Sequence, residues 1–195
     1  LNTLPWNVSY NVEKNETILE EDGFLPGTCG HLSGYPWGKL YKSSILKHFQ
    51  FPEGYWFEDT PVTFILAALP IKIVSIKDII YGYRLNPNGI TSKSLYNPKS
   101  IDSFWITELC LQEFPKFDLM YDQKAYEYLL RQSLMNAKRT KNQSRKIREA
   151  QFVLTCEIIK KYFNCFSTEN LKMKKIEEAL RDKRFIQFEL SKLYL

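Results

Sequence analysis

The stretch YNPKSIDSFWITELCLQEF, residues 96–114, divides the sequence into two parts with different patterns. Asn97 followed by Pro98 is a helix-start signal, because asparagine caps helices and proline fits the first helical position. Before this point, short β-branched and aromatic runs alternate with turn residues, whereas after it only helical patterning occurs. We therefore expect an α/β region with a mixed sheet over residues 1–97 and an all-α module over residues 98–195.

The second part predicts about four helices, because apolar residues recur there at helical spacing. The segments with this pattern are residues 98–114, 122–139, 145–163 and 168–185. The chain has no repeat of fixed period and no low-complexity segment. Residues 98–195 are therefore expected to form one helical extension.

The first part contains several strand candidates. WNVSYNV, residues 6–12, alternates apolar and polar residues, which is typical of a half-buried strand. Residues 17–21 read as a possible return strand after a turn, and residues 71–76 and 78–85 are rich in β-branched and aromatic residues. These runs predict the sheet of the α/β region.

Two helices are also expected in the first part. Residues 39–49 have apolar residues near helical spacing, and residues 60–70 carry clear start and stop signals. Thr60 is predicted as the N-cap, Pro61 fits the first helical position, and Pro70 ends the helix.

Composition indicates a folded, soluble protein. Of the 195 residues, 44% are hydrophobic and 15% aromatic, enough for one substantial core or two small ones. No run approaches the roughly twenty apolar residues that a membrane helix needs. The four cysteines form no CxxC pair, which is typical of reduced thiols in a cytosolic protein. The chain begins at Leu1 without a signal peptide, so we expect a fragment of a longer protein.

FPEGYWFEDTP, residues 51–61, is the candidate site: three aromatic residues precede the adjacent carboxylates Glu58 and Asp59. Asp59 comes just before the expected helix, whose dipole favours the ionised form that a general base requires. Flat aromatic side chains suit a sugar ring. The alternative is an ordinary charge at a helix start with core aromatic residues behind it, and composition alone does not decide between the two.

Three segments taken together, residues 36–46 (PWGKLYKSSIL), 51–66 (FPEGYWFEDTPVTFIL) and 81–92 (YGYRLNPNGITS), resemble family-2 glycosyltransferases. These are inverting enzymes of the GT-A type that build bacterial surface polysaccharides. The resemblance extends over roughly Trp6 to Ser92. It implies that residues 1–97 are the acceptor-side half of a GT-A-like domain, acting on a nucleotide-sugar donor and a saccharide or lipid-linked acceptor.

The resemblance also implies roles for individual residues. Asp59 is expected to be the catalytic base, which removes the proton of the acceptor hydroxyl as that oxygen attacks the anomeric carbon. The residues expected to bind the acceptor are Glu58, Trp37, Tyr55 and Trp56. Those expected to bind the donor diphosphate are Arg84, Thr91 and Ser92, since a guanidinium is well matched to phosphate oxygens.

The sequence departs from the family in two ways. Gly89 stands where serine is more usual in the donor loop. No nucleotide-binding half with an Asp-x-Asp-type motif for Mg²⁺ or Mn²⁺ is present, and the acidic cluster Glu20–Gly23 reads as a solvated turn. Cys29 and His31 lack a second ligand pair as well. We expect the full-length enzyme to use Mg²⁺ or Mn²⁺, this chain to bind none, and the chain alone to be inactive.

The formal charge of +5 is concentrated in residues 131–148, which contain seven basic residues and no acid. We expect this run to contact an anionic membrane surface from the cytoplasm, since such enzymes often use lipid-linked acceptors. A solvated helical face is the plain alternative. A rival interpretation of the protein is a non-catalytic binding or scaffold module; nucleic acid is not the expected partner, because few aromatic residues interleave with the run.

Overall fold

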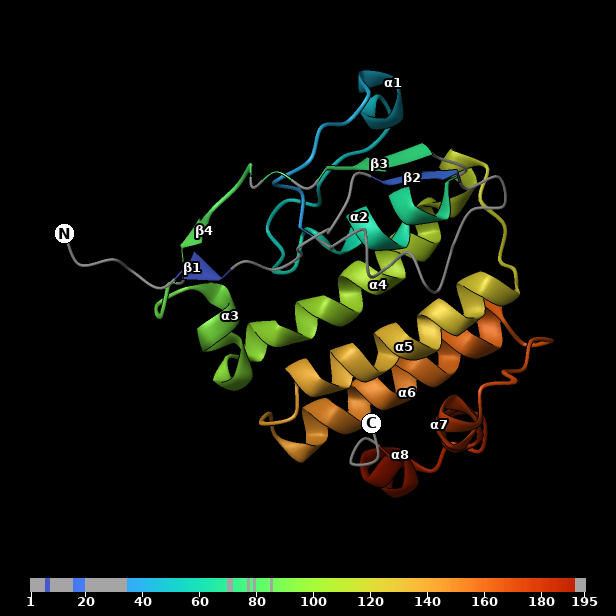
Figure 1. Cartoon of the computed structure of the whole chain (residues 1–195). Coiled ribbons are helices and arrows are strands. Elements are labelled where there is room, and N and C mark those ends of the chain that lie inside the picture. The colour runs from blue at the N-terminus through green and yellow to red at the C-terminus, as the bar shows by residue number, and fades with distance from the viewer. Residues whose placement is uncertain are drawn as a thin grey trace.

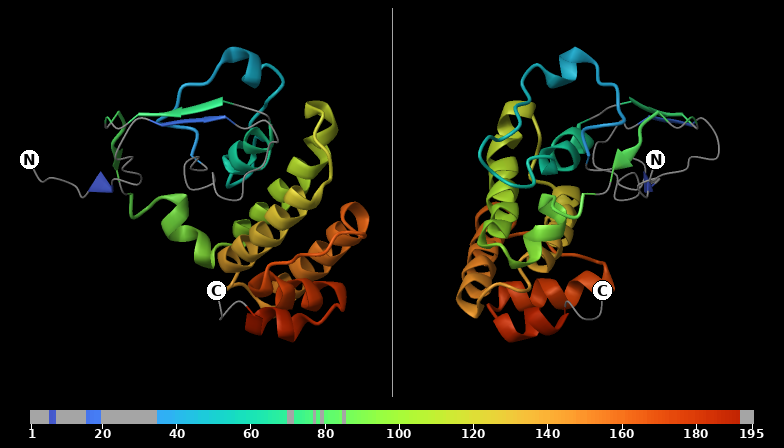
Figure 2. Two further views of the ribbon diagram at one scale, coloured as in Figure 1. Left: turned by 45° about the vertical axis from the view of Figure 1, so that its right-hand side comes forward. Right: turned by 90° about the vertical axis from the view of Figure 1, so that its left-hand side faces the viewer.

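The computed structural model describes residues 6–7, 16–19, 35–69, 72–76, 78, 80–84 and 86–191. A group of long helices forms the body of the protein, and the described segments before residue 97 lie along one side of it (Figures 1 and 2). The long helices are α4 (Asp102–Glu113), α5 (Gln123–Arg139), α6 (Arg145–Tyr162) and α7 (Leu171–Arg181), followed by the shorter α8 (Phe185–Ser191).

The remaining elements are short. The helices are α1 (Ser43–Leu46), α2 (Thr60–Phe64) and α3 (Ile90–Lys93), with 3-10 turns at η2 (Leu66–Ala68), η3 (Ser94–Tyr96), η4 (Pro98–Ile101) and η5 (Phe114–Phe117). The strands are β1 (Trp6–Asn7), β2 (Glu16–Leu19), β3 (Lys72–Ser75) and β4 (Tyr83–Arg84).

The helical segments predicted after residue 98 are confirmed, and polar side chains cap their N-termini. Asn97 caps η4, Asp122 caps α5, Ser144 caps α6 and Asn170 caps α7, each accepting a hydrogen bond from a backbone N–H of the first turn. Such caps satisfy N–H groups that have no partner within the helix.

The last segment, predicted as one helix over residues 168–185, contains α7, and a further helix that the sequence did not predict, α8, follows it. Lys183 has a φ of 54°, in the left-handed region, so the chain turns after α7 and begins α8 at Phe185.

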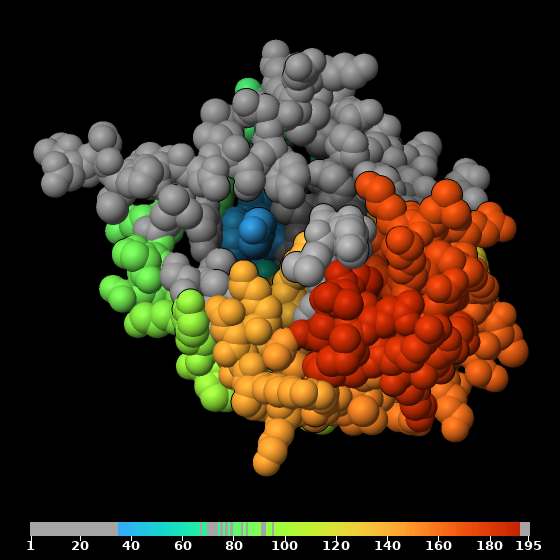
Figure 3. Space-filling model, turned by 90° about the horizontal axis from the view of Figure 1, so that it is seen from below, coloured from blue at the N-terminus to red at the C-terminus, as the bar shows by residue number. Residues whose placement is uncertain are grey.

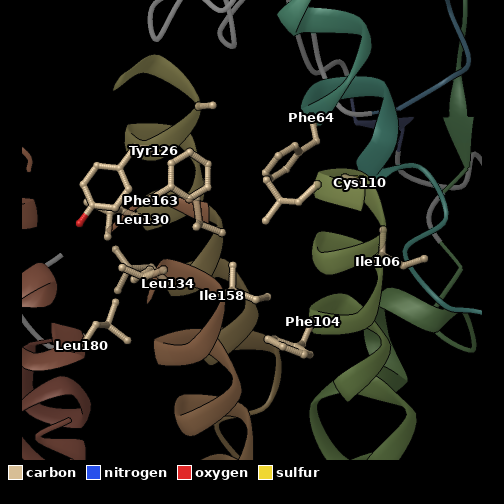
Figure 4. Packing of buried hydrophobic residues seen from close by; sticks show 14 of the residues in the cluster. Phe64, Phe104, Ile106, Cys110, Tyr126, Leu130, Leu134, Ile158, Phe163 and Leu180 are labelled. Atoms are coloured by element: carbon tan, nitrogen blue, oxygen red, sulfur yellow. The ribbon is translucent and has the colours of Figure 1, made fainter. Parts of the chain in front are cut away.

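One apolar core joins these helices. α2 packs on α4, α4 on α5, α5 on α6 and α7, and α7 on α8. Figure 4 shows side chains from α2 and α4, such as Phe64 and Phe104, facing those from α5 and α6, such as Leu130 and Ile158. The α2 segment is therefore attached to the helical body through its own buried residues.

The expected α/β fold with a mixed sheet is wrong: the described part of the chain belongs to the all-α class. Its strands form only two separate antiparallel ladders of two strands each. A ladder this small has no face on which to build a core. Accordingly, Val74 and Ile80, which the strand prediction would bury, are 58% and 62% exposed.

The strands also pair differently from the expected hairpin. β1 pairs with β4, aligning Trp6 with Arg84, whereas β2 pairs with β3. Both ladders join segments far apart in the sequence, and such long-range pairing gives no local signal. Residues 8–12 of the predicted first strand and residues 20–21 of the second lie outside the described residues.

The predicted helix over residues 60–70 is shorter than expected. α2 ends at Phe64, and η2 follows it. Thr60 is not the N-cap; Asp59 takes that position, without a side-chain capping bond. The helix predicted over residues 39–49 is reduced to the single turn of α1.

Candidate functional site

The segment before α2 places Asp59 at the boundary between the short elements and the helical body. The backbone N–H of Trp56 donates to Asp102 Oδ2 of α4 at 2.9 Å, which ties the segment to the core helices. Phe57 then has a φ of 64°, a left-handed conformation that is rare for a bulky residue. Backbone strain of this kind clusters at binding and catalytic sites, where the surrounding structure must hold it.

The Asp59 carboxyl is half-buried, and its pKa lies above the ordinary aspartate value. Burial is the main cause, and the nearby carboxylate of Glu58 adds to it, while Arg139, the backbone and Lys39 act in the opposite direction. The sequence predicted an ionised group stabilised by a helix dipole. The pKa is instead shifted in the opposite direction, and burial is the main cause of the shift.

Lys39 reaches the same site from the segment before α1. Its Nζ donates to the backbone carbonyl of Tyr35. Burial lowers the pKa of Lys39 to about 8, and Asp59 raises it in partial compensation. At neutral pH the ammonium is therefore largely protonated, but it lies within reach of deprotonation in mildly alkaline solution.

Arg139 comes from the last turn of α5, far along the chain from Asp59. Its Cζ lies 3.9 Å from the ring centroid of Phe57, a cation–π contact. Burial lowers the pKa of Arg139, while Asp59, Tyr128 and Tyr35 raise it. A cation from the helical body thus faces the carboxylate that the short elements supply.

Sequence reasoning counted Arg139 only as a member of the basic run. A signal for its separate role does exist. Gln132 and Asn136 are buried polar residues of α5, and Arg139 follows them at i, i+4 and i+7 spacing, which places all three on one helix face.

Aromatic rings form a wall on the Lys39 side of the site. Tyr35 and Trp37 stack with centroids 4.7 Å apart and planes inclined by 16°, and Trp37 stacks on Tyr81 at 6.2 Å and 29°. Gly38 has a φ of 67°, and a Cβ there would lie 3.5 Å from the Tyr81 side chain. Glycine suits this position because its φ lies in the left-handed region, which residues with a Cβ rarely adopt.

Figure 3 shows blue atoms of the segment that begins at residue 35, next to orange atoms from the region where α5 ends and α6 begins. This view agrees with the interaction of Arg139 with Tyr35 and Asp59. The site therefore combines a carboxylate, two cations and an aromatic wall.

Two of the residues expected to bind the acceptor lie elsewhere. Tyr55 and Glu58 line a groove of about 940 Å³ between the α1–α2 connection and the end of α4, together with His48, Phe51 and Phe117. Trp37 belongs to the aromatic wall instead, and the ring of Trp56 contacts Phe57 edge-on at 6.5 Å. The structure thus separates the predicted acceptor residues: Trp37 lies in the wall, Tyr55 and Glu58 line the groove, and Trp56 lies beside Phe57.

The residues expected to bind the donor lie further along the chain. Arg84 is exposed in β4, and in the described ranges it makes no ion pair. Thr91 and Ser92 belong to α3, where a loop was expected.

Gly89 precedes α3 with an ordinary negative φ, and its N–H donates to Asn86 O at 2.9 Å. A Cβ at this position would lie 3.1 Å from that same oxygen. The close turn accounts for glycine in place of the serine that the resemblance implies.

The described residues hold no group of three or more histidine, cysteine or acidic side chains that fits a metal ion. Two cations, Arg139 and Lys39, moreover act on Asp59, and they repel a divalent metal. Glu20–Gly23, Cys29 and His31 lie outside the described residues. Where the structure is described, the donor set does not fit Mg²⁺ or Mn²⁺.

The basic run of residues 131–148 is not one surface. Arg139 belongs to the site, Arg145 pairs with Glu149, and Arg148 pairs with Glu189. The exposed lysines of the run are Lys138, Lys141 and Lys146. Contact of this run with an anionic membrane stays a prediction, and fewer residues are available to it than the sequence count indicates.

Among the described helices, none is both long and apolar enough to cross a membrane. No protein-family model, curated protein or solved structure matches the chain.

Proposed function

We propose that this chain supplies the acceptor side of an inverting glycosyltransferase, in which Asp59 is the general base. The observation that carries the proposal is the position of Asp59: a half-buried carboxylate beside an aromatic wall, with Lys39 and Arg139 around it. The resemblance to family-2 glycosyltransferases supports the same assignment.

The reaction requires one proton transfer and one displacement. The acceptor hydroxyl gives its proton to Asp59, and its oxygen forms a bond to the anomeric carbon of the donor. The bond from that carbon to the nucleotide diphosphate breaks on the opposite face, so the configuration inverts and the diphosphate leaves with the electron pair. Asp59 then returns the proton to solvent.

The environment of Asp59 suits this role. Burial holds its pKa above that of an ordinary aspartate, so the carboxylate is a stronger base than an exposed one. Arg139 and Lys39 act against burial and keep the ionised form accessible. A base whose pKa approaches the working pH combines adequate ionisation with a good driving force for proton transfer.

Aromatic faces and charged acceptors together suit a saccharide. The stack of Tyr35, Trp37 and Tyr81 offers flat apolar surface to the C–H face of a sugar ring, while Asp59 accepts from a hydroxyl. Tyr35 and Tyr81 are both exposed, so a ring can reach the stack from solvent. In this proposal the donor is a nucleotide sugar, and Arg84 with the α3 segment contacts its diphosphate.

The proposal includes a location. Nucleotide sugars and lipid-linked acceptors meet at the inner face of the membrane, so we place the protein in the cytoplasm with peripheral contact to that face. Lys138, Lys141 and Lys146 supply the contact, at about 1 kcal/mol for each lysine near an anionic surface. Sedimentation with vesicles with and without anionic lipid tests it, and equal binding to both would contradict it.

A transfer assay on the natural full-length protein tests the function. A panel of nucleotide sugars is incubated with saccharide and lipid-linked acceptors, and product formation is compared between the native protein and Asp59→Asn. Loss of transfer in a folded variant supports the proposal. Undiminished transfer by Asp59→Asn would exclude Asp59 as the base and favour a binding or scaffold role for the chain.

A further inference from the structure

The guanidinium of Arg139 is incompletely hydrogen-bonded. Its guanidinium donates no hydrogen bond to any described residue, and its Nη1 is buried without a partner. Stacking on Phe57 satisfies the face of the guanidinium but not its N–H groups, which point outward in its plane. A buried donor without an acceptor costs about 1–3 kcal/mol, so such groups are seldom left unpaired without a reason.

The charge of Arg139 is also poorly compensated. Asp59 is the carboxylate that acts on it, and no ion pair of 4.0 Å or less joins the two. Asp59 is itself shared with Lys39. The other titratable groups that act on Arg139 are the phenols of Tyr35 and Tyr128.

Two other arginines of the helical body have carboxylate partners. Arg148 contacts Glu189, and Arg181 contacts Glu177 as well as several backbone carbonyls. Arg148 also has one buried nitrogen, Nε, without a partner, but it forms an ion pair, whereas Arg139 forms none within 4.0 Å in the described part of the chain. Arg139 lies where the aromatic wall and the proposed base meet.

We infer that the site takes a saccharide bearing an anionic group, a carboxylate or a phosphate, and that Arg139 binds this group beside Asp59. The inference rests on the proposed function for the saccharide and on Arg139 for the anion. A planar guanidinium with free N–H groups is well suited to the paired oxygens of a carboxylate or phosphate. Lys39 adds positive charge on the other side of Asp59.

The two sources of the anion are a uronic acid in the acceptor and a sugar phosphate. The experiment measures the binding of four compounds to the chain by calorimetry: glucuronate, glucose 1-phosphate, glucose and inorganic phosphate. We expect at least one anionic sugar to bind about tenfold or more tighter than glucose, and the identity of that sugar assigns the source. Inorganic phosphate should bind more weakly than that sugar, because it cannot use the aromatic wall.

Arg139→Gln should abolish the preference for the anionic sugar. Lys138→Gln is the matched control, because it removes one positive charge from the adjacent, exposed position at the end of α5. The inference is overturned if no compound binds, if glucose binds as tightly as the anionic sugars, if inorganic phosphate alone binds as tightly, or if the two variants have equal effects.

Two further variants test the inference even if Arg139→Gln does not fold. Arg139→Lys keeps the charge but not the paired donors, so it should reduce the preference severalfold while glucose binding changes little. Asp59→Asn removes negative charge next to the bound anion, so the preference should persist or increase. Loss of the preference in Asp59→Asn, or an unaltered preference in Arg139→Lys, would overturn the assignment.

The result is separable from the proposed function. If binding depends on Arg139 but transfer survives Asp59→Asn, the proposed reaction fails and the ligand class stands. If Asp59→Asn abolishes transfer but charged and neutral sugars bind alike, the ligand class fails and the reaction stands.

Discussion

Two carboxylates in this protein, Glu177 in the helical body and Asp59 in the site, have pKa shifts in opposite directions. Glu177 is 1% exposed, yet its pKa is lowered: burial would raise it, but hydrogen bonds from Lys174, Tyr126 and the Thr168 N–H outweigh burial. The Tyr126 hydroxyl donates to Glu177 at 2.7 Å and the Thr168 N–H at 3.1 Å. For Asp59, burial prevails and the pKa is raised.

The two carboxylates differ in their hydrogen-bond partners: those of Glu177 hold the fold together, whereas the site around Asp59 keeps a group without a partner among the described residues. The partners of Glu177 come from α5, α7 and the segment between α6 and α7, so its carboxylate holds these elements together. Asp59 has cations around it but no comparable set of donors, and Arg139 beside it keeps an unpaired N–H. Complete pairing stabilises a fold, whereas incomplete pairing leaves capacity for a ligand.

The largest expected effect is on transfer by Asp59→Asn in the full-length protein. Asparagine keeps the shape but cannot accept a proton, so we expect the rate to fall about 10²- to 10⁴-fold. Unfolding in urea should show stability unchanged or slightly increased, because the fold disfavours the charged form of Asp59. The exposed Asp78→Asn is the control and should leave both quantities as they are.

Glu177→Ala, in contrast to Asp59→Asn, should lower the stability of the fold. It removes a buried charge on which Tyr126, Lys174 and Arg181 converge, and breaking such a set costs about 3 kcal/mol or more of unfolding free energy. Glu178→Ala, the exposed neighbour in the same helix, should cost less than about 0.5 kcal/mol. Equal loss in the two variants, measured by urea unfolding, would show that the buried network contributes no stability.

The pH dependence of stability sharpens the comparison. The folded pKa of Glu177 lies below its unfolded value, so its contribution is present above the unfolded pKa and is lost as the pH falls through the folded pKa. Asp59 has the opposite sign: its contribution is present below the unfolded pKa and is lost as the pH rises through its raised folded pKa.

Urea unfolding between pH 3 and pH 7 measures both contributions. At pH 7, Glu177→Gln should be less stable than the native chain and Asp59→Asn should be slightly more stable. Both differences in unfolding free energy should shrink as the pH is lowered. Parallel curves for the native chain and both variants would contradict the assigned directions.

The smallest expected effect concerns Phe57. Phe57→Leu removes the ring on which Arg139 stacks, a contact worth about 0.5–2 kcal/mol, and we expect a loss of stability in that range. The control is Tyr96→Leu, which changes an exposed ring at 78% exposure and should have little effect. If stability does not change in Phe57→Leu, the cation–π contact does not hold the helical body to the site.

The helices after residue 98 were predictable because their signals are local. Apolar spacing and capping residues such as Asn97 and Ser144 act within a few positions of one another, and the structure confirms them. The prediction of a mixed sheet was wrong because an alternating pattern indicates only which residues are suited to a strand, and not whether other strands pair with it. Val74 and Ile80 have suitable side chains, but no third strand or covering helix buries them in the described part of the chain.

For the site, the sequence by itself singled out Asp59, Trp37 and the aromatic stretch around them. Only the tertiary structure decided that Asp59 has a raised pKa, that Glu58 faces the groove, and that Arg139 reaches Phe57 from the end of α5. The physical reason is distance along the chain. Helix starts and apolar faces depend on neighbours within a few residues, whereas the charge and solvation of a side chain depend on whatever the whole fold packs against it.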